Sequence, residues 1–253
     1  MAVFEQRRKR KKLSDYIIDD VKRWIVSEGK QPGDRLPNEK ELIEQTGYSK
    51  STVREALKAL EVGGLIEMRT GPNGGVYLQQ VTHEHASEPL RNFLHFYRLG
   101  WHDIYQLRKV LEPELAVSVV GKLTDEQLSK LAENLEFCTH GPKDDEDLLA
   151  QRAAEIEFHN ILASACPNPV LSFVCRFLND LLADLVVYRN VTDTHKFGET
   201  NVDFHALLLN AYRREDAETV HRVMVEHMKD AEDHMHLNAR MSGKGVLLAS
   251  DQR

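Results

Sequence analysis

The chain has 253 residues, 42% hydrophobic and 29% charged, with a net charge of -7, which describes a globular protein of two small domains or one large one. No stretch approaches the length of a membrane span and no apolar core follows the basic N-terminus, so we expect neither a membrane partner nor a secretory signal. Cys138, Cys166 and Cys175 are odd in number and lack metal-ligand spacing, which argues against a disulfide framework and predicts a reducing, cytoplasmic location.

The charge is divided unevenly along the chain. Residues 1–80 hold 15 basic and 12 acidic residues, a charge of +3, which leaves -10 for the remainder. Six of the basic residues form an unbroken run from Arg7 to Lys12. This asymmetry predicts an N-terminal part that faces nucleic acid and a second part with another task. We expect residues 1–12 to be a basic arm, either a disordered, solvated tail or a segment that orders on DNA.

Three short helices are expected after this arm. Apolar residues recur at helical spacing over residues 13–28, which predicts the first helix. Asn38 begins the second helix, because an asparagine with a glutamate three residues later forms a capping box, and Gly47 ends it. Ser49 caps the third helix, over residues 50–62, before a pair of glycines.

A β-hairpin is expected after the third helix. Two short strands, residues 65–69 and 75–78, flank the glycine-rich segment 70–74. Three short helices followed by a hairpin is the element order of a winged helix-turn-helix. The sequence therefore predicts that residues 13–80 form a winged helix-turn-helix DNA-binding domain.

The rest of the chain is expected to be helical, so the fold class is mainly α. Residues 81–88 lack strong periodicity and are interpreted as a linker, residues 89–237 as an all-helical bundle, and residues 238–253 as a frayed tail. The helical segments lie near residues 90–97, 102–121, 125–138, 146–165, 169–189, 199–212 and 217–236, with breaks at 121, 141–142, 167–169 and 192–194.

The start of the third helix has the composition that reading a DNA groove requires. Lys50, Ser51 and Arg54 are placed by helical periodicity on the face opposite Val53 and Leu57, which point inward. Basic and hydroxyl side chains at a helix N-terminus reach base edges and phosphates in the major groove. The alternative is that the two basic residues are ordinary solvated helix residues.

Residues 29–78 resemble the GntR family of bacterial regulators. Several of the shared positions have family-specific spacing, which separates the DNA-reading interpretation from the solvated one. The matching residues are Pro32, Gly33, Asp34, Arg35, Leu36, Pro37, Glu39, Glu41, Leu42, Ser49, Val53, Arg54, Glu55, Ala56, Leu57, Leu60, Gly64, Leu65, Ile66 and the wing from Gly71 to Gly75.

The resemblance implies a homodimer that binds double-stranded DNA at a short palindromic operator. Lys40 stands where the family often has arginine, and an ammonium group lacks the fork that contacts guanine in a bidentate way. The wing tip lacks a basic residue, for which Arg69 partly compensates. The DNA-contacting positions that the resemblance implies are Arg35, Lys40, Lys50, Ser51, Thr52, Arg54, Thr70 and Gly71.

Four residues of the helical part form a candidate metal site. Glu155 and His159 are four residues apart, so they lie on one face of one helix, whereas His205 and His227 lie in two other helices. One carboxylate and three imidazoles suit Zn, and also Ni, Mn or Fe. The spacing does not show whether the three helices bring these groups together.

Residues from about 102 to 228 look like the FCD ligand-binding domain of the FadR subfamily within the GntR regulators. The resemblance implies a metal site and an acidic small-molecule effector. Metal-binding members usually have aspartate where this chain has Glu155, whose longer arm changes its reach. The matching residues are Leu107, Arg108, Leu111, Glu112, Pro113, Ala116, Phe158, His159, Asn168, Pro169, His205, Ala211, Asp216 and His227.

Arg108 is the candidate effector-binding residue. It lies in an otherwise apolar helix, where an arginine needs an anionic partner. One candidate partner is Glu112, one helical turn further on, in a purely structural pair. The family resemblance implies the other, an acidic effector in the cavity of the domain.

The leading hypothesis is a ligand-responsive DNA-binding regulator, most simply a repressor. The first alternative is a metal-dependent enzyme tethered to DNA. No His-Glu-x-x-His motif, nucleophile signature or glycine-rich phosphate loop supports this enzyme hypothesis. Glu157 or Glu199 could be named as a general base, but no motif indicates either of them. The second alternative is a regulator whose metal is structural and whose effector pocket is degenerate.

Overall fold

The computed structural model describes residues 11–71, 74–97, 99–140, 142–187 and 195–242. Most of the expected basic arm and most of the expected tail lie outside these residues. The chain divides into two compact units, Met1–Leu90 and Arg91–Arg253, which are described separately.

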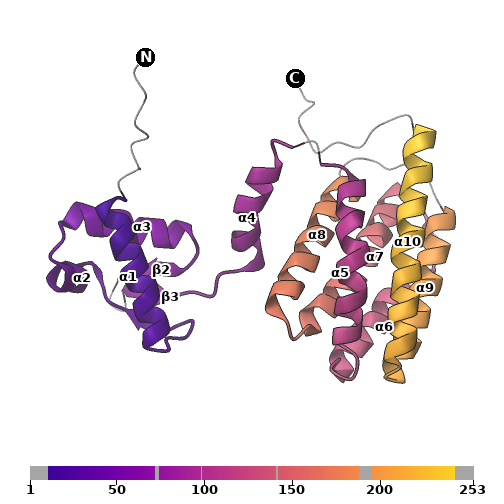
Figure 1. The fold of residues 1–253 in the computed structure, drawn as a ribbon, viewed down its shortest axis with the longest axis horizontal. Helices are drawn as coiled ribbons and strands as arrows, with labels where there is room; N and C mark the ends of the chain where they lie inside the picture. The colour runs from indigo at the N-terminus through magenta and orange to yellow at the C-terminus, as the bar shows by residue number, and fades with distance from the viewer. Residues whose placement is uncertain (1–10, 72–73, 98, 141, 188–194, 243–253) are drawn as a thin grey trace, which may run out of the picture. The chain divides into compact units, whose positions relative to one another are not determined.

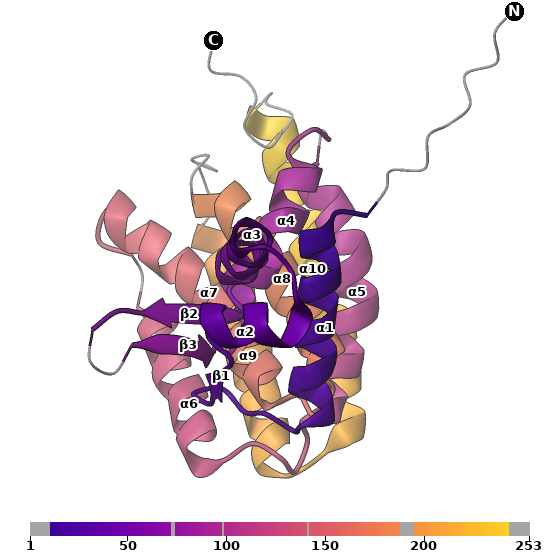
Figure 2. The ribbon, with the colours of Figure 1, turned by 90° about the vertical axis from the view of Figure 1, so that its left-hand side faces the viewer.

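The first unit is a winged helix-turn-helix. Its three helices cover a small antiparallel sheet with strand order β1-β3-β2, seen most clearly in Figure 2. The apolar faces of the helices and strands close around Val53, Ala56 and Ile66, which are almost fully buried. The elements, labelled in Figure 1, are α1 (Leu13–Ser27), β1 (Arg35–Leu36), α2 (Glu39–Thr46), α3 (Lys50–Val62), β2 (Ile66–Arg69) and β3 (Gly75–Leu78).

The expected helix caps are present. Asn38 accepts a hydrogen bond from the backbone N–H of Glu41, whose side chain accepts one from the backbone N–H of Asn38. Gly47 ends α2 with a φ of 70°, a left-handed conformation that favours glycine. Ser49 caps α3 by accepting from the N–H of Thr52. These local bonds set the angle at which α3 leaves the turn.

Strand β1 was not expected from the sequence. It has two residues, too few for an alternating pattern, and it exists because Arg35 and Leu36 pair with Tyr77 and Val76 of β3. Leu36 is thereby buried in the core of the unit. A strand this short depends on its partner strand, and that partner lies far along the chain.

Residues 83–88 of the expected linker are helical in the structure, in one helix whose end overlaps the helical segment expected near residues 90–97. Helix α4 (His83–Leu94) begins after Thr82, whose hydroxyl accepts from the N–H of His85. Ser87 is buried. A polar residue therefore occupies an inward-facing position of α4, where a helical pattern normally has an apolar residue. The periodicity failed because this helix has few apolar residues in its first two turns.

The second unit is an all-helical bundle in the residues described. Figure 1 shows α5 beside α10, and the contacts place α5 also against α8, α7 between α6 and α8, and α9 against α6 and α10. Helix α10 continues past 237, where a frayed tail was expected to begin. The expected breaks at 141 and 192–194 lie outside the described residues. The helices are α5 (Trp101–Ser118), α6 (Asp125–Thr139), α7 (Asp145–Ala165), α8 (Pro169–Val187), α9 (His195–Arg213) and α10 (Ala217–Ser242).

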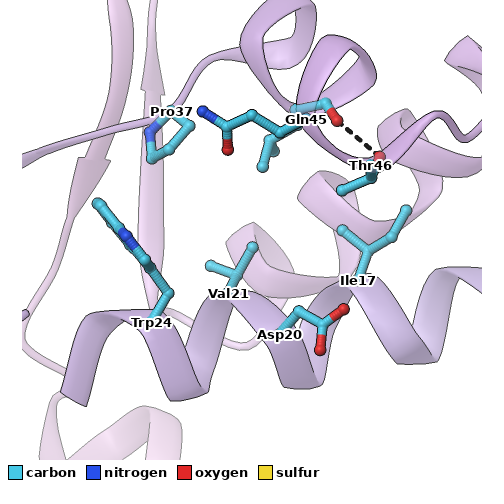
Figure 3. A pocket seen from close by; sticks show the side chains of 8 residues that line it. Ile17, Asp20, Val21, Trp24, Pro37, Gln45 and Thr46 are labelled. Atoms are coloured by element: carbon cyan, nitrogen blue, oxygen red, sulfur yellow. Dashed lines mark hydrogen bonds between the residues drawn. The ribbon is translucent and has the colours of Figure 1, made fainter. Parts of the chain in front are cut away.

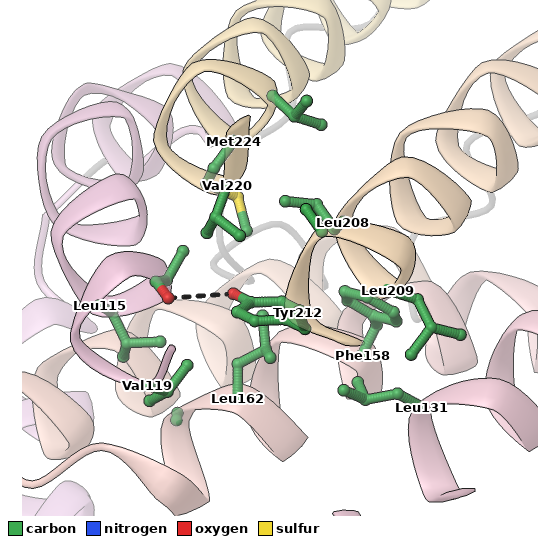
Figure 4. Close-up of a cluster of buried hydrophobic side chains, with 14 of the residues drawn as sticks. Leu115, Val119, Leu131, Phe158, Leu162, Leu208, Leu209, Tyr212, Val220 and Met224 are labelled. Carbon is green, nitrogen blue, oxygen red and sulfur yellow. Dashed lines mark hydrogen bonds between the residues drawn. The ribbon is translucent and has the colours of Figure 1, made fainter. Parts of the chain in front are cut away.

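Of the two apolar cores that the described residues of this bundle form, one lies around Phe158 of α7. Figure 4 shows Phe158, Leu162 and Leu208 meeting between α7 and α9, all of them fully buried. The hydroxyl of Tyr212, within the same core, donates a hydrogen bond of 3.2 Å to the carbonyl of Ala116 on α5. The described helices include none long and apolar enough to cross a membrane.

Candidate metal centre and DNA-reading helix

Helix α3 presents its basic residues to solvent. The side chains of Lys50 and Arg54 are 65% and 64% exposed, and Ser51 is also exposed. Val53 and Leu57 are buried on the opposite face, as the periodicity predicted. The N-terminus of α3 is therefore an exposed, cationic helix end on a packed support, the arrangement that enters a major groove in helix-turn-helix proteins.

One residue that the sequence analysis did not assign organises this surface. Glu39, at the start of α2, accepts a hydrogen bond of 2.8 Å from Nε of Arg54. Its other carboxylate oxygen lies 3.7 Å from Nζ of Lys50. Sequence spacing alone offered no signal for this contact, because it depends on the angle at which α2 and α3 pack against each other.

The other expected DNA-contacting residues are spread over the same unit. Lys40 is 85% exposed and lies 3.8 Å from Glu44 on its own helix. Arg35 is exposed in β1, with Nε close to Gly75 of the wing. Thr52 is half-buried, and its hydroxyl lies 2.8 Å from that of Ser49.

The wing lies between β2 and β3, where the sequence predicted it, and residues 72–73 lie outside the described residues. Thr70 is exposed, and Gly71 has a φ of 94°. The carbonyl of Gly71 accepts from the N–H of Gly74, where a Cβ would lie 2.8 Å from backbone oxygens. Arg69 pairs with Glu67 at 2.8 Å, so part of its charge is already neutralised.

A cavity of about 180 Å³ lies between α1 and α2 in this unit (Figure 3). Ile17, Val21 and Trp24 form its wall on α1, facing Pro37 and the α2 residues around Gln45. It is smaller than the roughly 300–1,000 Å³ of most ligand pockets, and its walls are chiefly apolar. We therefore assign it no effector.

Three of the four expected metal ligands meet inside the second unit. Helices α7, α9 and α10 bring His159, His205 and His227 together, and one nitrogen of each lies within 4.8 Å of those of the other two. We call these three residues the histidine cluster. Nε2 of His227 lies 3.2 Å from Nε2 of His159 and 3.2 Å from Nε2 of His205.

The histidine cluster fits a metal ion. Bonds of about 2.1 Å hold neighbouring ligand nitrogens about 3.0–3.4 Å apart in octahedral or tetrahedral geometry. The two observed separations of 3.2 Å lie in that interval. Nε2 of His227 therefore faces the other two rings, whereas its Nδ1 is buried and has no hydrogen-bond partner among the described residues.

The environment keeps these imidazoles neutral, the form that binds metals. Burial lowers the pKa of His159, although the carboxylate of Glu112 partly opposes this. Burial lowers the pKa of His205 and His227 well below the ordinary value, and neighbouring positive charge lowers both further. A neutral ring leaves a nitrogen lone pair available to a metal.

Glu112 links the histidine cluster to Arg108. Its Oε2 lies 3.2 Å from Nδ1 of His159, and its Oε1 accepts from Nε and Nη2 of Arg108 at 3.3 and 3.2 Å. Burial alone would raise the pKa of Glu112, but the charge of Arg108 and the hydrogen bonds from His159 and Arg108 hold it below its ordinary value. A carboxylate behind a ligating imidazole fixes the orientation of that ring. The sequence analysis treated Glu112 only as the partner of Arg108 and missed this second contact.

Glu155 does not join the histidine cluster in this structure. Nη1 of Arg152 donates to both of its carboxylate oxygens, at 3.2 and 2.9 Å, and Nδ2 of Asn201 donates to Oε2 at 3.0 Å. Burial raises the pKa of Glu155, while Arg152 and Asn201 oppose that rise. The expected fourth ligand thus lies one helical turn from His159 with its oxygens already engaged.

Comparisons with known proteins cover both units. The model of the bacterial regulatory proteins of the gntR family matches residues 13–76, and the FCD domain model matches residues 103–230. The HTH-type transcriptional repressor NanR of Enterobacter sp. (strain 638) is 27% identical over 239 residues, which cover 93% of this chain and 90% of that protein. NanR of Salmonella newport (strain SL254) is 28% identical with the same coverage.

A solved structure shares the fold. Streptococcus agalactiae GntR superposes with a TM-score of 0.61 at 22% sequence identity, over 87% of this chain and 99% of that one. The named relatives are transcription regulators, which favours the regulator hypothesis over the DNA-tethered enzyme. The chain belongs to the GntR family of bacterial transcription regulators and carries a C-terminal FCD domain.

Proposed function

We propose that this protein is a repressor that binds a palindromic operator as a homodimer. The observation that carries the proposal is the exposed cationic end of α3, where Lys50 and Arg54 stand on a buried support. Relatives named as repressors that align along 93% of the chain support it. A two-fold dimer presents two such helices, so half-sites related by two-fold symmetry are the matching DNA.

Selection from random DNA duplexes tests this function. We expect the full-length protein to enrich a palindrome of two half-sites, and light scattering to give two chains in each DNA complex. Enrichment without dyad symmetry, or one chain on each duplex, would contradict the dimer. No enrichment over non-specific binding would contradict sequence-specific repression.

We further propose a divalent metal in the helical domain, most simply Zn, with Ni, Mn or Fe as the other candidates. His159, His205 and His227 would hold it, and Glu155 is the fourth ligand once it leaves Arg152. Bound there, a metal with an open position supplies a Lewis-acidic site for an effector oxygen. The spacing of the three Nε2 atoms and the carboxylate of Glu112 behind His159 support this assignment.

Mass spectrometry of protein purified without chelator tests the metal. The wild type should carry one ion, and His205→Ala and His227→Ala should both lose it. The exposed His221, on the same helix as His227, provides the matched control, and His221→Ala should keep the ion. A metal-free wild type that takes up none of the four metals on addition would remove the proposal.

The effector that we propose is a small organic acid or acyl derivative, in the manner expected of the FadR subfamily. Arg108 is its candidate contact and is 3% exposed beside the histidine cluster. Its guanidinium donates to Glu112 from Nε and Nη2, so an acid would add to an existing ion pair rather than neutralise a lone charge. Such a ligand changes DNA binding only if it favours one arrangement of the two DNA-binding units over another.

A further inference from the structure

Two polar layers lie one helical turn apart inside the bundle. On α7, Glu155 precedes His159 by four residues, and on α9, Asn201 precedes His205 by four. Residues four apart share a helix face, so both helices present the same order of groups to the interior. One layer is the histidine cluster, and the other is a buried contact between Glu155 and Asn201.

In the second layer both oxygens of the Glu155 carboxylate have partners, whereas Oδ1 of Asn201 is buried without a hydrogen-bond partner among the described residues. Glu155 is 7% exposed, and its two oxygens accept hydrogen bonds from Arg152 on the preceding turn and from Asn201 across the bundle. The Arg152 side chain is only 11% exposed, so solvent screens this ion pair weakly. Nη1 of Arg152 donates to both oxygens in a bifurcated contact, and a buried carboxylate with such a charged donor is held more firmly than one in a surface pair.

We propose that Arg152 and Asn201 withhold the Glu155 carboxylate from the histidine cluster, so that the protein binds metal less tightly than its four donor side chains allow. The inference rests on the metal site proposed above and adds the residues that control its affinity. To reach the cluster, Glu155 must give up its contacts with both partners.

The same groups could instead hold Glu155 in place as a ligand, and the geometry argues against this. The ligand nitrogens of the three histidines lie within 4.8 Å of one another, and no oxygen of Glu155 belongs to that group. Glu155 has a longer arm than the aspartate usual in metal-binding members, so on this proposal its carboxylate reaches the cluster by a rotation of the side chain. Arg152 therefore competes with the metal for the carboxylate.

Competition titrations of Zn²⁺ against a chromophoric chelator test the inference. The chelator-stripped full-length protein is compared with Arg152→Gln, Glu155→Gln and the double variant. We expect Arg152→Gln to bind Zn²⁺ about tenfold more tightly than the wild type, and we expect no such gain when Arg152→Gln is added to Glu155→Gln. Asn201→Ala should give a smaller gain in the same direction. Arg222→Gln removes an exposed arginine on α10 and controls for net charge.

The outcomes are distinct. Zn²⁺ binding that is unchanged or weaker in Arg152→Gln would overturn the inference and make Arg152 an orienting partner of a bound Glu155. A gain that persists without Glu155 would also overturn it, since the effect would then be purely one of charge. Absence of Zn²⁺ binding in the wild type and in every folded variant would overturn the metal site and the inference together. Circular dichroism of the stripped proteins establishes which variants are folded.

Discussion

Arg54 on α3 donates a hydrogen bond of 2.8 Å to Glu39 at the start of α2, so the residue best placed to read DNA is paired with a carboxylate before DNA arrives. The same carboxylate lies 3.7 Å from Lys50. Glu39 thus orients two basic side chains and also reduces the positive potential of the DNA-reading end. Orientation favours specificity, whereas lost potential weakens non-specific attraction to phosphates.

Glu39→Gln should therefore raise the affinity for random-sequence DNA and lower the specificity for the operator. We expect binding to random-sequence duplexes to strengthen by up to about 1 kcal/mol, the scale of an exposed ion pair, and the ratio of operator to random binding to fall. Fluorescence anisotropy at two salt concentrations measures both. Glu44→Gln, which removes the partner of Lys40 on the same helix, is the control. An unchanged ratio would show that Glu39 has no orienting role.

Arg54→Ala should weaken operator binding by roughly 1–3 kcal/mol if its guanidinium contacts a base, because one good bidentate contact is worth that much. Titration against the selected operator measures the loss. Lys58→Ala, one turn further along α3 and paired with Glu61, removes an equal charge at a site farther from the helix end. Equal losses in both variants would reduce Arg54 to a general phosphate contact.

Arg108 has a structural task as well as a candidate effector task. Arg108→Ala leaves the fully buried Glu112 without its guanidinium, so unfolding in denaturant should show a loss of roughly 3–5 kcal/mol. Arg108→Met combined with Glu112→Gln removes the charge pair and keeps an oxygen for His159, so it should recover much of that loss. Full stability in Arg108→Ala would mean that the ion pair contributes little.

The Arg108→Met/Glu112→Gln variant also tests the effector. Saturating a native-state site at about 100 times the dissociation constant adds roughly 2.7 kcal/mol to stability. A panel of carboxylic acids, sugar acids, fatty acids and acyl thioesters should contain one class that raises the melting temperature of the wild type and not that of this variant. A shift retained in the variant would exclude Arg108 from the effector site.

The metal-free protein should lose stability as the pH falls below about 6.5. Burial lowers the pKa of all three clustered histidines, so the unfolded chain takes up protons in a range where the folded one does not. The free energy of unfolding is then highest above pH 6.5. Below that pH it falls by about 1.4 kcal/mol per pH unit for each histidine. Urea unfolding between pH 7.5 and 5 measures the slope.

His227→Gln should reduce that slope by about one proton, because one imidazole no longer titrates in the unfolded chain. His221→Gln, at an exposed position of the same helix, is the comparison variant. An equal slope in the wild type and in His227→Gln would show that this ring is protonated as readily in the folded protein as in the unfolded one.

Much of the first unit could be predicted from the sequence, because its helix caps and apolar faces depend on residues close together in the chain. The capping box at Asn38, the left-handed Gly47 and the apolar face of α3 act over a few residues, so the spacing of residue types along the chain was enough to place them. The same holds for the pairing of Glu155 and His159 on one helix face. The first turns of α4 were missed because its capping residue precedes a polar stretch, and strand β1 because its partner strand is distant.

The assembly of the candidate sites came from contacts between distant segments. His159 and His205 are brought to His227 by the packing of three helices, and Glu112 reaches the cluster from a fourth. Whether the Glu155 carboxylate contacts the histidine cluster or Arg152 and Asn201 depends on which groups lie nearest to it in the folded protein. A sequence records the periodicity of each helix face, whereas the rotation and depth of one helix against another follow from the packing of whole side chains in the shared core.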